Sequence, residues 1–445
     1  MEIMKEAGNY DNSRERSSPL KLGILALSFL FSFGYFFVTN GEWEVHLLSF
    51  KGAFEFYVII LILCAFLYIR KANFYLQPGN VALGLALVGL SYILISSTLA
   101  LSYYGQPFYY GVIETRRSFV LFSPVLFTLI YLYLRPTLTD VFFALLIACF
   151  LQVALAATNQ YGFSSQLLSR NIPDADPRRL RIANGAGLYS SLLVVAIARF
   201  GKVGFISNWI AVVLSCFGLV GVAQSKALLA TSLASFAIIL LKRRPILIAT
   251  GVALISFGAM YGLSLSPNPG NQLPDMVEAI VPGLGLGQLL QSGDDVRSST
   301  THTIFSELYN NHFIGMGALS LMWNEGFIPY FGDHFFLSDV GIVGELFQVG
   351  ILYPFLSICV FMFMVYAFVN AESDVARLSI FALIAMIVVS LPAAGLFQSP
   401  FYGIMQIIAL SSRENGKRSI GSGKIYYLKY RLHYRCFKRD RAVQK

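Results

Sequence analysis

Residues 81–101 read VALGLALVGLSYILISSTLAL, an apolar run without a charged side chain. A helix rises 1.5 Å per residue and the hydrocarbon core of a bilayer is roughly 30 Å thick, so about 20 such residues form one transmembrane span. The composition of the whole chain also indicates a membrane protein. Of its residues, 56% are hydrophobic and 13% are charged, whereas soluble proteins carry about 25% charged residues. The composition therefore excludes an ordinary soluble protein.

Outward from this stretch, similar apolar runs recur along most of the chain. They predict an all-α, polytopic transmembrane helical bundle of about twelve spans. The predicted spans are 22–39, 52–69, 81–101, 118–134, 140–157, 183–198, 206–224, 227–241, 245–264, 346–368, 378–395 and 400–412. The transmembrane domain would cover residues 22–412, between an N-terminal tail of residues 1–21 and a basic C-terminal tail of residues 413–445.

The basic residues predict the orientation, because loops rich in Lys and Arg stay in the cytoplasm. With both termini inside, residues 158–182 and the large loop of residues 265–337 are extracytoplasmic. Much of the net charge of +9 belongs to the C-terminal tail, which suits anionic lipid head groups. Nucleic acid is the alternative ligand for that tail, and we do not expect it as a partner.

Several basic residues are predicted outside against this bias. They are Arg116 and Arg117 at the start of the fourth span, Arg170, Arg178, Arg179 and Arg181 in the loop before the sixth, Lys226 at the mouth of the eighth, and Arg297 in the large loop. A guanidinium can hold two oxygens of a phosphate, so these residues predict an anionic ligand. The alternatives are that Lys226 reaches the interface along its own apolar stem and that Arg181 has a structural ion-pair partner.

Acid–base candidates lie around the start of the tenth span. His334 and Asp339 precede it and Glu345 stands at its beginning, where desolvation can raise the pKa of a carboxyl. The alternative role of Asp339 is to cap the tenth helix. The spacing of the histidines and carboxylates matches no metal-binding signature, so no metal is expected.

Three motifs carry a resemblance to a known family. Residues 225–229 (SKALL) are similar to Ser-Arg-x-Ala-Leu, Arg297 precedes the glycine-rich residues 311–317 (NHFIGMG), and residues 339–351 end in Gln-Val-Gly-Ile. In this order the chain resembles the O-antigen ligase and O-antigen or exopolysaccharide polymerase superfamily, which are membrane-embedded GT-C-type glycosyltransferases. Two residues depart from the ligase pattern: Asp339 stands where ligases have His, and Lys226 where Arg is common.

The resemblance implies an enzyme of the bacterial inner membrane that polymerises polyprenyl-diphosphate-linked oligosaccharide repeat units into O-antigen, capsular polysaccharide or exopolysaccharide on the outer face. Arg181, Lys226, Arg297 and Arg117 would bind the diphosphate, Asp339 or His334 would accept the acceptor proton, and Glu345 is a third acid–base candidate. No cofactor is implied. The implied partners are the lipid-linked oligosaccharide, membrane lipids, a chain-length regulator protein and a flippase.

Two alternatives stay open at this point. One is an O-antigen ligase, which transfers the glycan to lipid A core in lipopolysaccharide biosynthesis. The other is a flippase of lipid-linked oligosaccharide, which Glu55 within the second span favours. A transporter usually has two similar halves, and the chain shows no internal repeat.

Overall fold

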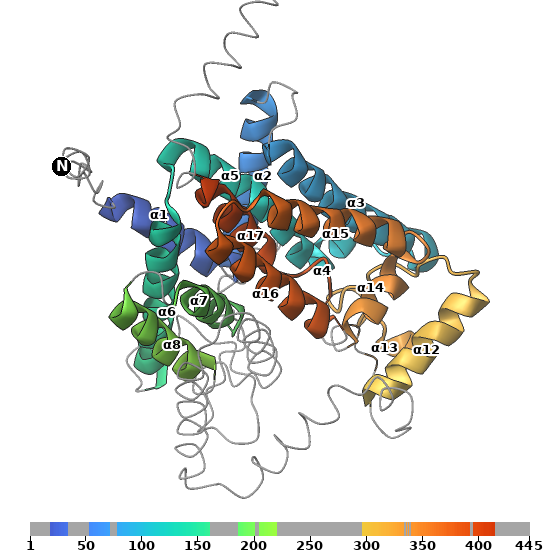
Figure 1. Cartoon of the computed structure of the whole chain (residues 1–445). Helices are drawn as coiled ribbons and strands as arrows, with labels where there is room; N and C mark the ends of the chain where they lie inside the picture. The colour runs from blue at the N-terminus through green and yellow to red at the C-terminus, as the bar shows by residue number, and fades with distance from the viewer. Residues whose placement is uncertain are drawn as a thin grey trace, which may run out of the picture.

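The computed structural model describes residues 18–33, 53–71, 78–160, 186–200, 204–219, 296–332, 335, 337, 340–391 and 395–413. This part of the chain is mostly helical and contains no strand. Figure 1 shows the helices packed side by side, with α12 (Val296–Asn310), α13 (Ile328–Phe331) and α14 (Gly341–Val349) gathered at the lower right. The predicted all-α class is confirmed for the described residues.

Among the described residues, three helical stretches are long and apolar enough to cross a membrane. The first is in α3 (Pro78–Tyr104), the second joins η3 (Arg116–Phe122) to α5 (Ser123–Leu134), and the third is α15 (Tyr353–Asn370). Shorter apolar helices match other predicted spans. These are α1 (Pro19–Ser32), α2 (Ala53–Lys71), α6 (Leu138–Gln160), α7 (Ala186–Arg199), α8 (Phe205–Phe217) and α17 (Phe401–Ser411). The predicted spans 227–241 and 245–264 lie outside the described residues, so the number twelve stays a prediction.

The predicted tenth span is wrong at its beginning. Instead of one helix over residues 346–368, the chain forms α14 (Gly341–Val349), breaks, and resumes as α15. The break is at Gly350, which has a φ of 62° and leaves no room for a Cβ beside the backbone of Gly315. Apolar composition alone cannot reveal such a contact, because Gly315 lies far away in the sequence.

The described end of the predicted large loop is folded against α3. It contains α12 (Val296–Asn310), α13 (Ile328–Phe331) and, between them, the non-helical residues 311–320, which begin with a turn and which we call the strap. The strap donates backbone hydrogen bonds from Met316 to Phe347 (2.8 Å) and from Ala318 to Ser96 (3.2 Å). An aromatic cluster packs beside it, made of Tyr104, Phe327, Phe331, Phe335 and Phe347.

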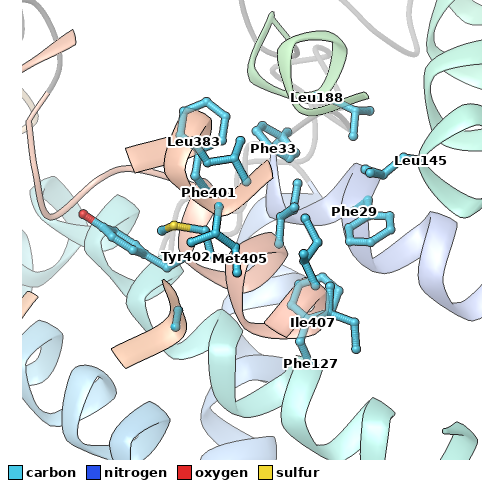
Figure 2. Close-up of a cluster of buried hydrophobic side chains, with 14 of the residues drawn as sticks. Phe29, Phe33, Phe127, Leu145, Leu188, Leu383, Phe401, Tyr402, Met405 and Ile407 are labelled. Carbon is cyan, nitrogen blue, oxygen red and sulfur yellow. The ribbon is translucent and has the colours of Figure 1, made fainter. Parts of the chain in front are cut away.

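Helix α17 forms the centre of the bundle. All of its residues are buried, as expected for a helix that is apolar on every side. Figure 2 shows Phe401, Met405 and Ile407 of α17 among side chains from neighbouring helices, including Phe29 of α1 and Phe127 of α5. The one polar side chain in its middle, Gln406, donates a hydrogen bond to Thr128 Oγ1 (3.0 Å).

Basic residues gather at the end of the bundle opposite the aromatic cluster. Lys21 pairs with Asp140 at 3.6 Å, and the guanidinium of Arg199 lies 4.1 Å from the centre of the Phe142 ring. Helices α5 and α17 run parallel, because Gly403 packs on Ser123 and Gln406 on Thr128. The ends of both helices, and with them Arg135 and Arg413, therefore lie on one side, which is the arrangement that the orientation rule requires.

This arrangement predicts which end faces out of the cytoplasm. In a cysteine-free background, Tyr309→Cys on exposed α12 should react with a membrane-impermeant maleimide added to intact cells, whereas Arg135→Cys should react after the cells are opened. A cysteine-free background is needed because Cys359 is exposed. Labelling of position 135 and protection of position 309 in intact cells would reverse the orientation.

Candidate functional site

The chain breaks between α4 (Phe108–Glu114) and η3, and polar groups satisfy the carbonyls that the break leaves open. The Gly111 carbonyl accepts from the Thr115 N–H (3.1 Å) and the Thr115 hydroxyl (2.8 Å), and Arg116 Nη1 donates to the Ile113 carbonyl (2.6 Å). Irregular backbone at membrane depth is tolerated where protein or a water-filled cavity surrounds it. This break is therefore a place where a polar cavity is expected.

Close backbone contacts fix the depth of the break along α3. A Cβ on Gly111 would lie 2.7 Å from Ser97 Cα, and one on Gly89 would lie 3.0 Å from Leu121 Cβ. At 1.5 Å per residue, Ser97 and Gly89 lie about 10 and about 22 Å along α3 from Tyr104. The break thus lies beside the inner part of α3 and not beyond its end.

Three charged residues occupy this break, and with Ser320 of the strap we call them the polar break: Glu114, Arg116 and Arg117. Glu114 and Arg117 are exposed, and Arg116 is half-buried. The Glu114 carboxyl is hydrogen-bonded with Ser320 and lies within electrostatic reach of Arg116 and Arg117. Charges at such a depth are costly unless they face the bundle interior or water.

One buried side chain between α3 and α4 holds the end of the strap that carries Ser320. Gln106 donates to the carbonyl of Ala318 (2.9 Å) and accepts from the N–H of Ser320 (2.8 Å). Both Gln106 and Ser320 are buried. The carboxamide therefore replaces a backbone pairing and holds Ser320 next to Glu114.

A second polar group surrounds Glu345 on α14. Its carboxyl is buried and accepts hydrogen bonds from the N–H of Leu396 (2.7 Å), the N–H of Phe397 (2.8 Å) and the hydroxyl of Tyr353 (3.3 Å). Leu396 and Phe397 belong to the turn between α16 (Asp374–Ser390) and α17. Burial raises the pKa of Glu345 to about 8 in spite of these hydrogen bonds.

Aromatic side chains enclose this carboxyl. Tyr92 of α3 donates to Gln348 and stacks on Phe397 with ring centres 4.5 Å apart. The hydroxyl of Tyr402 donates to the Leu396 carbonyl (2.7 Å). Glu345 thus lies between α3, α14, α15 and the α16–α17 turn, with both carboxyl oxygens engaged.

The predicted site residues fall into three groups. Arg117 is in the polar break and Glu345 is buried under the α16–α17 turn. Arg297 lies in α12, with its side chain outside the described part. The candidates that fall outside the described residues are Arg181, Lys226, His334 and Asp339.

Several polar residues were missed by sequence reasoning. The signal for Glu114 was available, since Glu-Thr-Arg-Arg directly precedes an apolar run. Gln106 and Ser320 gave no signal, because their partners are distant in sequence. Among the described residues, no three His, Cys, Asp or Glu side chains are grouped so as to hold a metal ion.

Glu345 predicts a pH dependence of stability. Its pKa is about 8 in the fold against an ordinary value of 4.5, so its contribution is complete below the ordinary pKa and is lost as pH rises through the folded value. We expect the melting temperature in detergent to fall by about 5 °C or more between about pH 6 and about pH 9. Glu345→Gln should flatten this slope; an equal slope in both proteins would contradict the assignment.

No protein-family model matches the chain, and no curated protein matches it either.

Proposed function

We propose that this protein is a membrane-embedded glycosyltransferase that polymerises polyprenyl-diphosphate-linked oligosaccharide repeat units on the outer face of the bacterial inner membrane. The observation that carries the proposal is the polar break. It combines two guanidinium groups and a carboxylate on irregular backbone, beside the inner part of a helix long enough to span the membrane. A lipid-anchored anion is a ligand that reaches such a depth.

The proposed glycosyl transfer requires positively charged side chains at the polar break. When the glycosidic bond breaks, its electron pair leaves with the lipid diphosphate, and prearranged positive charge stabilises the developing anion. Arg117 is exposed and can present its guanidinium to two phosphate oxygens. Arg181, Lys226 and Arg297 remain proposed as further cations for the same diphosphate.

The acceptor needs a base. A sugar hydroxyl that attacks the anomeric carbon must lose its proton, and we propose Asp339, or else His334, as the group that takes it. Asp339 directly precedes Val340 in the sequence, and Val340 packs in the same hydrophobic cluster as Phe347. We propose no metal and no cofactor for the transfer.

A flippase is the second candidate, because transporters also place broken helices at their substrate sites. The break between α4 and η3, with its charged side chains, is the observation in its favour. A ligase that uses lipid A core as acceptor would need the same donor chemistry.

Deletion of the gene, followed by gel analysis of surface glycans, separates the three functions. A polymerase predicts glycans with one repeat unit and loss of longer chains. Loss of every repeat from lipid A core indicates a ligase. If glycans are lost altogether and lipid-linked repeat units accumulate on the cytoplasmic face, the protein is a flippase and the proposal fails.

Arg117→Ala should abolish chain extension at a normal protein level, because a cation for the leaving diphosphate is lost. Arg117→Lys should retain less than about a tenth of the activity, since bidentate geometry is lost with the guanidinium. Arg70→Ala, at an exposed arginine on the basic end, is the matched control and should extend chains normally. Wild-type chain lengths in Arg117→Ala would remove Arg117 from the mechanism.

Asp339→Asn distinguishes a base from a helix cap. Asn preserves capping but cannot serve as a carboxylate base, so we expect nearly complete loss of chain extension at normal expression. Near-normal chains in this variant would assign Asp339 to capping, and His334→Ala would then test the other proposed base.

A further inference from the structure

We propose that Glu345 is a positioning residue: it clamps the α16–α17 turn onto α14, α14 holds the strap, and the strap places Ser320 against the charged side chains of the polar break. The expected effect of Glu345 on catalysis rests on the proposed transferase function. Its expected effect on the position of the strap does not depend on that function.

The first link joins α14 to the turn. One carboxyl oxygen of Glu345 accepts the Phe397 N–H and the other accepts the Leu396 N–H, at 2.8 and 2.7 Å. A second connection runs from the Ile342 N–H to the Leu391 carbonyl (2.9 Å). A Cβ at Gly395 has no room beside the carboxyl, so the turn approaches Glu345 as closely as glycine permits.

The second link joins α14 to the strap. Within three residues of Glu345, the carbonyls of Phe347 and Gln348 accept from the N–H groups of Met316 (2.8 Å) and Gly317 (3.0 Å). A Cβ on Gly315 would lie 2.5 Å from the backbone of Val349. A shift of α14 would therefore move the strap with it.

The third link joins the strap to the polar break. Gln106 holds Ala318 and Ser320 through two hydrogen bonds, and the Ser320 hydroxyl bonds Glu114. Glu114 in turn lies within electrostatic reach of Arg116 and Arg117. The path from Glu345 to Glu114 is thus made of hydrogen bonds and close backbone contacts, and its last step to Arg117 is electrostatic.

A carboxyl group suits the clamp better than a carboxamide. Two adjacent N–H groups need two acceptor oxygens, which Glu345 provides. Gln has one acceptor oxygen and would turn an NH₂ group toward the other N–H, which leaves a buried donor unsatisfied. Glu345→Gln therefore weakens the clamp without opening a cavity.

The test measures the position of the strap directly. In a cysteine-free background, Glu114→Cys and Ser320→Cys should form a disulfide under mild oxidation, because the Ser320 hydroxyl is hydrogen-bonded with the Glu114 carboxyl. Adding Glu345→Gln should slow the initial rate about tenfold, which is within the range of couplings carried by contact networks. Glu372→Gln, at an exposed glutamate on the opposite end, is the control and should leave the rate unchanged.

A second experiment measures the transfer reaction, with protein that keeps its native cysteines and with a purified lipid-linked donor. Glu345→Gln should lower kcat about tenfold or more, since misplacement of reacting groups is costly, with little change in KM. Equal cross-linking rates with and without Glu345→Gln, in proteins that both elute as folded monodisperse species, would overturn the proposal. If Glu345→Gln does not fold, Tyr353→Phe removes one donor to the same carboxyl and should slow cross-linking about twofold; an unchanged rate there overturns it as well.

The two proposals fail separately. Cross-linking needs no substrate, so an inactive wild-type protein whose cross-linking depends on Glu345 would refute the transferase and support the clamp. An active wild-type protein whose cross-linking ignores Glu345 would refute the clamp alone.

Discussion

A helix that breaks inside an apolar bundle exposes backbone N–H and C=O groups that lipid cannot satisfy, and this structure depends on how three such breaks are filled. At the α14–α15 break, the Phe313 carbonyl accepts from the Ile351 N–H (2.9 Å). At the α16–α17 turn, the Glu345 carboxyl takes the exposed N–H groups. Between α4 and η3, Thr115 and Arg116 bond the open carbonyls.

The three breaks are neighbours, and this places polar groups together in an otherwise apolar molecule. The strap bonds α14 on one side and α3 on the other, and Tyr92 of α3 contacts both Gln348 and Phe397. Where protein groups bond the open N–H and C=O groups of a helix break, the break can hold charged side chains at a fixed depth in the bundle. The charged side chains of the polar break are therefore held in place, as the proposed stabilisation of a leaving anion requires.

The apolar runs of the sequence predicted most helices that the structure describes, because length and composition decide whether a segment suits lipid. Residues 81–101 lie within α3, and residues 118–134 cover most of η3 and α5. The split at Gly350 was not predictable, since its cause is Gly315 on a distant segment. The sequence shows Glu345 only as a carboxyl group before an apolar run, which made it an acid–base candidate. Its hydrogen-bond partners were not predictable, because the N–H groups that bind it lie about fifty residues further along the chain.

The most direct measurement of the central claim is transfer by the purified protein. The protein would be reconstituted in liposomes and supplied with a polyprenyl-diphosphate-linked repeat unit as both donor and acceptor. The account predicts a ladder of longer lipid-linked glycans, with one free polyprenyl diphosphate released for each bond formed and no requirement for a nucleotide sugar. Binding of the donor without any ladder or diphosphate release, in a preparation that stays folded, would contradict it.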